Sequence, residues 1–206
     1  MPSTTKKFSI LRYLAHVLYP YIFEDQERRE AHALRQKMAQ CKSCGNWYQV
    51  KQSYNIRGCE YITIGENFRA GAHMRLEAID SYEEETFSPE LIIGNNVAIQ
   101  DFCHIGCVEK VVIGDGTLIA SKVFISDHMH GHITVEDLTC RPELRKINHQ
   151  PVCIGTNVWI GEGASILAGV TLGDNVIVGA NAVVTRSFPA NCVIAGCPAK
   201  VIKQLV

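Results

Sequence analysis

The feature that most constrains the fold is an aliphatic residue that returns at every sixth position. From residue 154 onward this position is filled without interruption, and glycine follows it in four of the six repeats. Six residues exceed a helical turn and do not match a heptad, but they suit a short strand followed by a tight corner. The aliphatic residues of this run are Ile154, Ile160, Ile166, Leu172, Val178 and Val184.

The same period continues upstream in blocks of three repeats. Three units that each turn the chain by about 120° would close a triangular coil, and successive coils would stack as parallel strands about 4.8 Å apart. We therefore predict an all-β fold, a parallel β-helix over residues 56–206, with about five coils between residues 56 and 195. The upstream aliphatic positions are Ile64, Ala70, Leu76, Ile93, Ile99, Ile105, Ile113, Ile119 and Ile125.

Three insertions interrupt the repeat, and they add 11, 2 and 23 residues after Leu76, Ile105 and Ile125. Each insertion follows the third unit of a block, so all three should leave the prism at the same corner and border a cleft there. Loops on a rigid scaffold carry chemistry more often than the scaffold itself. We expect the acidic run Glu83–Glu85 in the first insertion to be a solvated loop tip.

The composition fits one domain of 206 residues with an N-terminal extension. A net charge of −1 and 47% apolar residues give no sign of a nucleic-acid partner. Nine cysteines without a signal peptide predict reduced thiols in a cytoplasmic protein. The pair Cys41 and Cys44 forms a lone CxxC, which lacks the second pair that a zinc site needs.

Residues 1–55 are predicted to form a helical extension, and a short helix is expected at the C-terminus. The apolar, aromatic segment FSILRYLAHVLYPYIF is shorter than the roughly 20 residues of a membrane span, so membrane contact should be peripheral at most. We expect it to pack on its own domain, because Pro20 would break a long amphipathic helix.

The chain resembles the hexapeptide-repeat acyltransferases, most specifically over IGTNVWIGEGASILAGVTLGDNVIVGANAVVTRSFPANCVIAGCPAKVI, residues 154–202. Among them it is most similar to the sugar O-acetyltransferases that modify galactosides, maltose, lipopolysaccharide or capsule. The resemblance implies a left-handed β-helix and a homotrimer with active sites between subunits. It also implies transfer of acetyl from acetyl-CoA to a hydroxyl of a sugar or glycan.

The stretch ISDHMHGH, residues 125–132, places three histidines around Asp127. They could be metal ligands, a catalytic base with companions, or part of a solvated loop. A zinc site needs three or four converging ligands, and no second set stands nearby, so no metal is expected. Deprotonation of an attacking hydroxyl needs one neutral imidazole, and Asp127 could orient that ring.

The resemblance leaves two candidates for the base. In similar enzymes the base often opens a D-H-x-H pattern, which favours His128, whereas a gapless count against the galactoside enzymes places it at His130. His132 is expected to contact solvent or acceptor.

The resemblance also assigns candidate binding residues. The acetyl-CoA set lies in the C-terminal coils, with Arg186 where the family has lysine, and consists of Trp159, Gly161, Ala180, Thr185, Arg186, Lys200 and Lys203. Acceptor contacts are expected from Gln100, Asp101 and Asp127, together with the 129–150 loop. For Gln100 the assignment departs from the family, which has asparagine near that position.

Two other functions remain open from the sequence. A xenobiotic acetyltransferase that inactivates an antibiotic would use the same fold and base. A zinc-dependent carbonic anhydrase of the gamma type also uses this fold, but it gathers histidines from several coils and subunits, including a pair separated by four residues. Here only three residues separate His128 from His132. A trimer that serves purely as a scaffold is a further alternative to these two functions.

Overall fold

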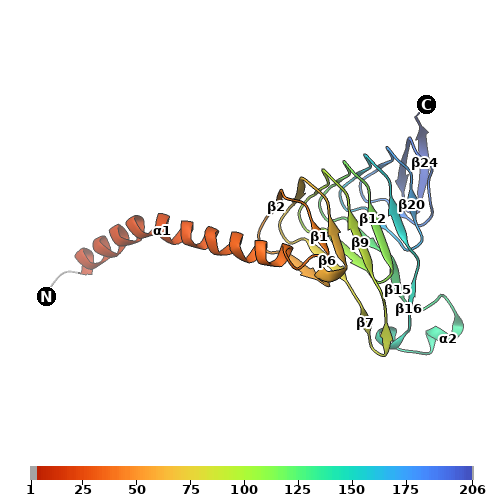
Figure 1. Ribbon diagram of the computed structural model, residues 1–206, viewed down its shortest axis with the longest axis horizontal. Coiled ribbons are helices and arrows are strands. Elements are labelled where there is room, and N and C mark those ends of the chain that lie inside the picture. The colour runs from red at the N-terminus through yellow and green to blue at the C-terminus, as the bar shows by residue number, and fades with distance from the viewer. Residues whose placement is uncertain (1–3, 206) are drawn as a thin grey trace. The chain divides into compact units, whose positions relative to one another are not determined.

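The computed structural model describes residues 4–205, which divide into a helix and a strand-rich unit that begins at Ala39 (Figure 1). The helix α1 spans Thr4–Met38 without interruption. The expectation that Pro20 would break it is therefore wrong, because proline removes only one backbone donor and the turns on both sides keep theirs. No helix in the described part of the chain has the length and apolarity needed to cross a bilayer.

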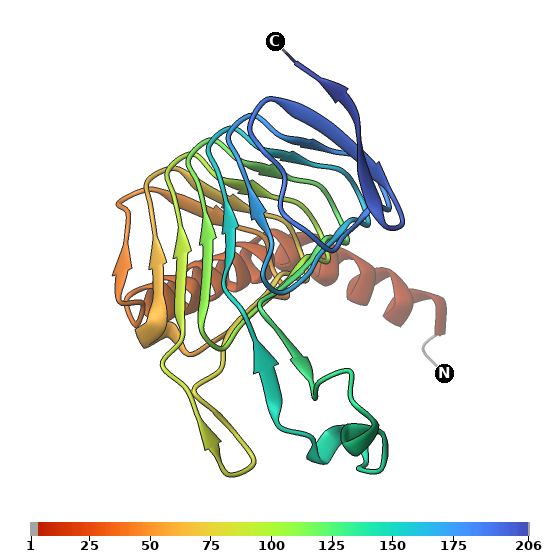
Figure 2. The same cartoon turned by 90° about the vertical axis from the view of Figure 1, so that its right-hand side faces the viewer.

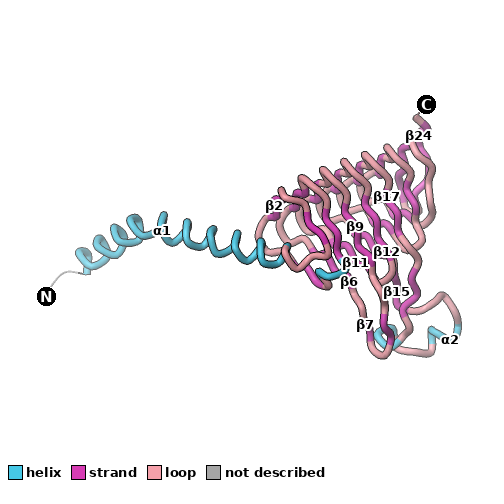
Figure 3. The backbone as a smooth tube through the Cα atoms, in the orientation of Figure 1, coloured by secondary structure: helices cyan, strands magenta, loops and turns pink. Residues whose placement is uncertain are grey.

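Three stacks of short parallel strands form the walls of a prism (Figures 1 and 3). Sheet A contains β1 (Ser43–Cys44), β4 (Ile62–Ile64), β9 (Glu90–Ile93), β12 (Lys110–Ile113), β17 (Val152–Ile154) and β20 (Thr171–Leu172). Sheet B contains β2 (Tyr48–Val50), β5 (Phe68–Ala70), β10 (Ala98–Ile99), β13 (Leu118–Ile119), β18 (Trp159–Ile160), β21 (Ile177–Val178), β23 (Cys192–Gly196) and β24 (Ala199–Gln204). Sheet C contains β3 (Asn55–Arg57), β6 (Arg75–Ala78), β11 (His104–Cys107), β14 (Phe124–Ser126), β19 (Ser165–Ile166) and β22 (Val183–Val184).

The strand register confirms the β-helix type of fold. Trp159 lies opposite Ile177, one full coil of three repeats later, and Ser165 lies opposite Val183 in the same way. The six aliphatic residues of the uninterrupted run are all buried. Stacking them inside the prism removes apolar surface from water, which is the main force that holds such coils together.

The prism begins earlier than the predicted residue 56, because β1, β2 and β3 form an additional coil. Cys44, Val50 and Ile56 lie opposite Ile64, Ala70 and Leu76, so they occupy the aliphatic positions of that coil. A cysteine stands at the first of these positions, and although Gly45 follows it, no glycine follows Val50 or Ile56, so the repeat was not recognised from the sequence.

All three insertions leave the prism between a strand of sheet C and the next strand of sheet A, as predicted (Figure 2). The first insertion is a hairpin of β7 (Ser81–Tyr82) and β8 (Glu85–Thr86). The third is a longer excursion that contains β15 (His128–His130), α2 (Val135–Leu138), η2 (Pro142–Leu144) and β16 (Ile147–His149). A further short helix, η1 (Cys59–Tyr61), joins β3 to β4.

The short C-terminal helix predicted from the sequence is wrong. Ala199–Gln204 instead forms β24, which pairs antiparallel with β23 at the end of sheet B. Gly196 turns the chain with φ 101°, a conformation that glycine adopts without steric cost. The β-branched Val201 and Ile202 suit a strand, and β24 covers the edge that the last parallel strand would otherwise leave unpaired.

Candidate functional site

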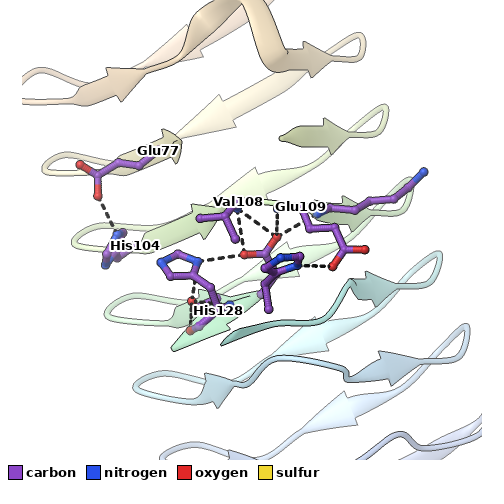
Figure 4. A network of polar contacts seen from close by, with 9 residues as sticks. Glu77, His104, Val108, Glu109 and His128 are labelled. Atoms are coloured by element: carbon purple, nitrogen blue, oxygen red, sulfur yellow. Dashed lines mark hydrogen bonds and ion pairs between the residues drawn. The ribbon is translucent and has the colours of Figure 1, made fainter. Parts of the chain in front are cut away.

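Asp127 lies fully buried where the longest insertion leaves β14. Its carboxylate accepts hydrogen bonds from three consecutive backbone N–H groups, those of Val108, Glu109 and Lys110, at 2.8–3.1 Å (Figure 4). Val108 and Glu109 link β11 to β12, where the two-residue insertion falls, and Lys110 is the first residue of β12. The small insertion therefore has a definite structural role, which is to form a pocket of backbone donors around a buried carboxylate.

The same carboxylate holds the imidazole of His128. Asp127 Oδ1 lies 2.9 Å from His128 Nδ1, and Ser126 Oγ lies 3.2 Å from that nitrogen (Figure 4). Burial acts to raise the pKa of Asp127, but the hydrogen bonds from His128 and from the backbone outweigh it and hold that pKa below its usual value. A carboxylate can only accept, so Nδ1 carries the proton and Nε2 of neutral His128 is left as an acceptor.

Gly106 provides the surface on which the His128 ring rests. It lies in β11 next to Ser126 of β14, and a Cβ built on it would stand 3.0 Å from His128 Cε1. Its φ lies outside the left-handed region, so the backbone conformation does not require glycine here. The requirement is space: a methyl group at this position would crowd His128 Cε1, and the imidazole would have to shift by a few tenths of an ångström.

We predict that Gly106→Ala lowers kcat of the reaction expected from the sequence about 10- to 100-fold, because it displaces the candidate base His128, and a shift of a catalytic group by less than 1 Å has effects of this size. The thermal melting temperature should change little, since alanine is acceptable in a strand. Steady-state kinetics and a melting curve on the same preparation would check both. An unchanged kcat would show that the ring is not fixed by this contact.

A second histidine–carboxylate pair lies beside His128. His104 Nε2 is 2.9 Å from Glu77 Oε2, and a Cβ at Gly106 would lie 3.8 Å from both this nitrogen and His128 Nε2 (Figure 4). Burial lowers the pKa of His104, and Arg75 adds to this, while Glu77 opposes it. Glu77 and this role of His104 were not predicted. Their signal is the alternation of polar residues along β6 and β11, which places both on the outer face of sheet C.

The structure separates the other two histidines from this arrangement. His130 is exposed on β15, and its ring meets that of Tyr82 edge-on at 5.1 Å. His132 is exposed, and its backbone N–H donates to the Asp137 carboxylate. The contact with the buried Asp127 distinguishes His128 from His130, the other candidate for the base.

The first and third insertions pack against each other. Tyr82 Oη donates to the backbone oxygen of Glu143 at 2.6 Å, and Glu85 accepts from the Ile147 N–H at 2.8 Å. Glu83 and Glu84 are exposed, as expected of a loop tip, but Glu85 fastens the two insertions together. The cleft expected at this corner stays a prediction.

Five of the acetyl-CoA candidates lie on sheet B or at the corner that follows it. Trp159 is 51% exposed on the outer face of sheet B. Gly161 and Ala180 stack at the corner that follows, where a Cβ on Gly161 would lie 2.7 Å from the Ala180 nitrogen. Lys200 and Lys203 are exposed on β24 of the same sheet.

Thr185 and Arg186 lie on another edge of the prism, between sheets C and A. They follow β22, which is two strands from β14 in sheet C, and are therefore on the edge where His128 stands. The Arg186 guanidinium lies 5.2 Å from the centre of the Phe188 ring.

The acceptor candidates Gln100 and Asp101 are not brought to His128. Both lie between β10 and β11, at the start of a sheet C strand, whereas His128 lies beyond the end of one. Asp101 accepts from the Ala72 N–H of the neighbouring coil at 2.8 Å, which is a structural contact.

An open pocket of about 360 Å³ lies elsewhere on the prism, lined by Trp47, Asn67, Arg69 and Asn96. None of the predicted site residues lines it. Among residues 4–205, no group of three or more histidine, cysteine, aspartate or glutamate side chains is arranged to hold a metal ion.

Comparison with known proteins identifies the family to which the chain belongs. Residues 154–186 match the model of the bacterial transferase hexapeptide (six repeats). The putative lipopolysaccharide biosynthesis O-acetyl transferase WbbJ of Escherichia coli K12 is 42% identical over 153 residues, which are 72% of this chain and 74% of that protein. The chain belongs to the hexapeptide-repeat acyltransferase family. Its relatives include a galactoside O-acetyltransferase and a putative colanic acid biosynthesis acetyltransferase, both of Escherichia coli K12, and the chain spans 44% and 62% of their lengths.

Solved structures of this family support the assignment. A maltose O-acetyltransferase from Clostridium difficile 630 is 30% identical with a TM-score of 0.56, covering 89% of this chain and 78% of that one. A galactoside acetyltransferase in complex with coenzyme A is 28% identical with a TM-score of 0.52, covering 87% of this chain and 71% of that one. The hexapeptide-repeat acyltransferase relatives thus include one with coenzyme A bound.

Proposed function

We propose that this acyltransferase moves the acetyl group of acetyl-CoA to a hydroxyl of a sugar or glycan, such as a precursor of lipopolysaccharide or capsule. The observation that carries the proposal is the Asp127–His128 pair, which leaves an acceptor nitrogen at the corner where the insertions leave the prism. The relatives support the reaction class, since they include a putative lipopolysaccharide biosynthesis O-acetyl transferase, a maltose O-acetyltransferase and a galactoside acetyltransferase.

The pair can perform the proton transfers of direct attack. His128 Nε2 accepts the proton of the acceptor hydroxyl as its oxygen bonds to the thioester carbonyl carbon. Asp127 holds Nδ1–H and stabilises the imidazolium that forms, while a backbone N–H serves as donor to the carbonyl oxygen. The carbon–sulfur bond then breaks, and the imidazolium returns the proton to the departing thiolate. The products are the acetyl ester and free coenzyme A.

We further propose a left-handed coil and a homotrimer with active sites between subunits, in the cytoplasm. The distribution of the candidate acetyl-CoA residues supports the shared site. Trp159 and the lysines of β24 lie on sheet B, whereas Thr185 and His128 lie on the edge between sheets C and A. One subunit would supply the first group and its neighbour the second.

Trp159→Ala is expected to raise the Kd for coenzyme A about tenfold, because removal of a large aromatic ring from a binding edge costs contact area. Isothermal titration with coenzyme A would measure it. Trp47→Ala is the matched control, since Trp47 is equally exposed in a distant pocket and should leave the Kd unchanged. If the two substitutions change the Kd equally, Trp159 does not contact coenzyme A as proposed.

The function itself is tested by thiol release from acetyl-CoA across a panel of acceptors. Neutral sugars, acidic sugars, nucleotide-linked sugars and hydroxyl-bearing antibiotics separate the glycan proposal from xenobiotic acetylation. Release that depends on a sugar acceptor is expected. Release only with an antibiotic, or release that ignores the acceptor, would contradict the proposal.

A further inference from the structure

Beside His128, four side chains on the outer face of sheet C form a donor-rich cluster, which we call the Arg57–His104 cluster: Arg57, Arg75, Glu77 and His104. The parallel register places Arg57 opposite Glu77 and Arg75 opposite His104. Glu77 points outward by strand alternation, yet it is only 4% exposed. Its partners cover it: Arg75 at 2.6 Å, His104 at 2.9 Å and Arg57 at 3.7 Å.

This arrangement leaves positive charge facing solvent. The side chains of Arg57 and Arg75 are 67% and 50% exposed, while the one carboxylate that partners them is buried. Two guanidinium groups against one carboxylate leave a charge of +1, and burial favours the neutral form of His104 by lowering its pKa. Asp127 does not offset this, because it is buried and bonded to backbone N–H groups and His128.

The buried carboxylate also orients the donors. It engages one terminal nitrogen of Arg75, and a guanidinium has five N–H donors, so others remain free for a ligand. Donors of this kind suit the oxygens of a phosphate or a carboxylate, which arginine binds with two parallel hydrogen bonds. Figure 4 shows His104 in the coil next to that of His128, and Glu77 one coil further on.

We propose that the Arg57–His104 cluster is a subsite for an anionic group on the acceptor, so that the acetylated sugar carries a phosphate or a carboxylate near its reactive hydroxyl. This inference rests on the proposed function, whose site it extends. The exposed acidic residues Glu83 and Glu84 belong to the β7–β8 hairpin, which projects away from the prism (Figure 2).

Binding is tested with three probes at equal ionic strength: glucose, glucuronate and glucose 1-phosphate. Nuclear magnetic resonance of the His104 imidazole and the Arg75 Nε–H would report occupancy. At least one anion should shift these signals saturably while glucose does not, and the tighter anion identifies the group. If neither anion binds, or if glucose acts like them, the subsite is refuted.

Three variants locate the site. Arg75→Gln should weaken binding of the preferred anion at least about tenfold, as expected for loss of a charge-assisted hydrogen bond. Arg75→Lys should retain part of it, which controls for folding around Glu77. Arg69→Gln, an exposed arginine on sheet B, should have no effect. Equal weakening by Arg69→Gln would show a nonspecific charge effect and overturn the proposal.

The two proposals fail separately. Anion binding without acetyl transfer to any sugar would remove the proposed function, and the cluster would then be an anion site with no role toward an acceptor. If acetyl transfer occurs with equal KM for neutral and anionic sugars, and no anion binds, the proposed function stands and the anionic subsite is refuted.

Discussion

His128→Ala is expected to lower acetyl transfer about 10²- to 10⁴-fold, the usual contribution of a general base. The variant removes the only ring that the buried Asp127 orients among the described residues, while the prism around it keeps its packing. The loss should appear in kcat, with the KM for acetyl-CoA changed little. Thiol release under saturating acetyl-CoA measures it.

His130→Ala is the matched control, because His130 lies two residues away on the same strand but is exposed and contacts Tyr82. Its activity should stay within about threefold of the wild type, which is the scale of a lost exposed contact. If instead His130→Ala abolishes transfer and His128→Ala does not, the gapless count against the galactoside enzymes is correct. The Asp127 contact would then be structural.

Asp127→Asn is expected to lower both activity and stability. When the amide oxygen keeps the bonds to the Glu109 and Lys110 N–H groups, its NH₂ faces Nδ1 and favours the wrong tautomer of His128, so transfer should fall about 10²- to 10⁴-fold. In that orientation the NH₂ group also faces the Val108 N–H, and a buried donor without a partner costs about 1–3 kcal/mol, so the free energy of unfolding should drop by about 2 kcal/mol or more. Kinetics and urea denaturation measure the two effects.

The stability effect should depend on pH with a definite sign. The pKa of Asp127 is lowered in the folded state, so its stabilisation is present above the unfolded value of about 3.9 and is lost as pH falls through the folded value. The gap between wild type and Asp127→Asn should therefore be full at pH 7 and narrow below about pH 4. Glu162→Gln, an exposed ion-pair partner of Lys122, should show almost no gap at either pH. A gap independent of pH would contradict the charged state assigned to Asp127.

Much of the scaffold was predictable because it is periodic. Hydrophobic stacking repeats a local rule, so the phase of Ile154 and its successors was enough to predict coils, parallel strands and a shared corner for the insertions. The six-residue repeat also includes Cys44 and Val50, but it was not recognised there from the sequence. At the C-terminus two adjacent β-branched residues, Val201 and Ile202, were too few to outweigh the expectation of a helix.

The site was predictable only in part. The D-H-x-H pattern favoured His128 over His130, and the structure distinguishes the two by the contact with buried Asp127, although the role of the base stays a proposal. The roles of Gly106 and Glu77 depend on which residues of adjacent coils share a face, and those residues are 20 or more positions apart in the chain. A single sequence does not show that a glycine is there to make room for a ring from the next coil.

The sequence by itself determined the period of six, the buried aliphatic positions and the corner at which the chain leaves the prism. These follow from interactions between equivalent positions of identical short units. Only the tertiary structure decided which polar groups meet at that corner. Insertions of 11, 2 and 23 residues have no repeat to follow, and their hydrogen bonds depend on the exact register of three neighbouring coils.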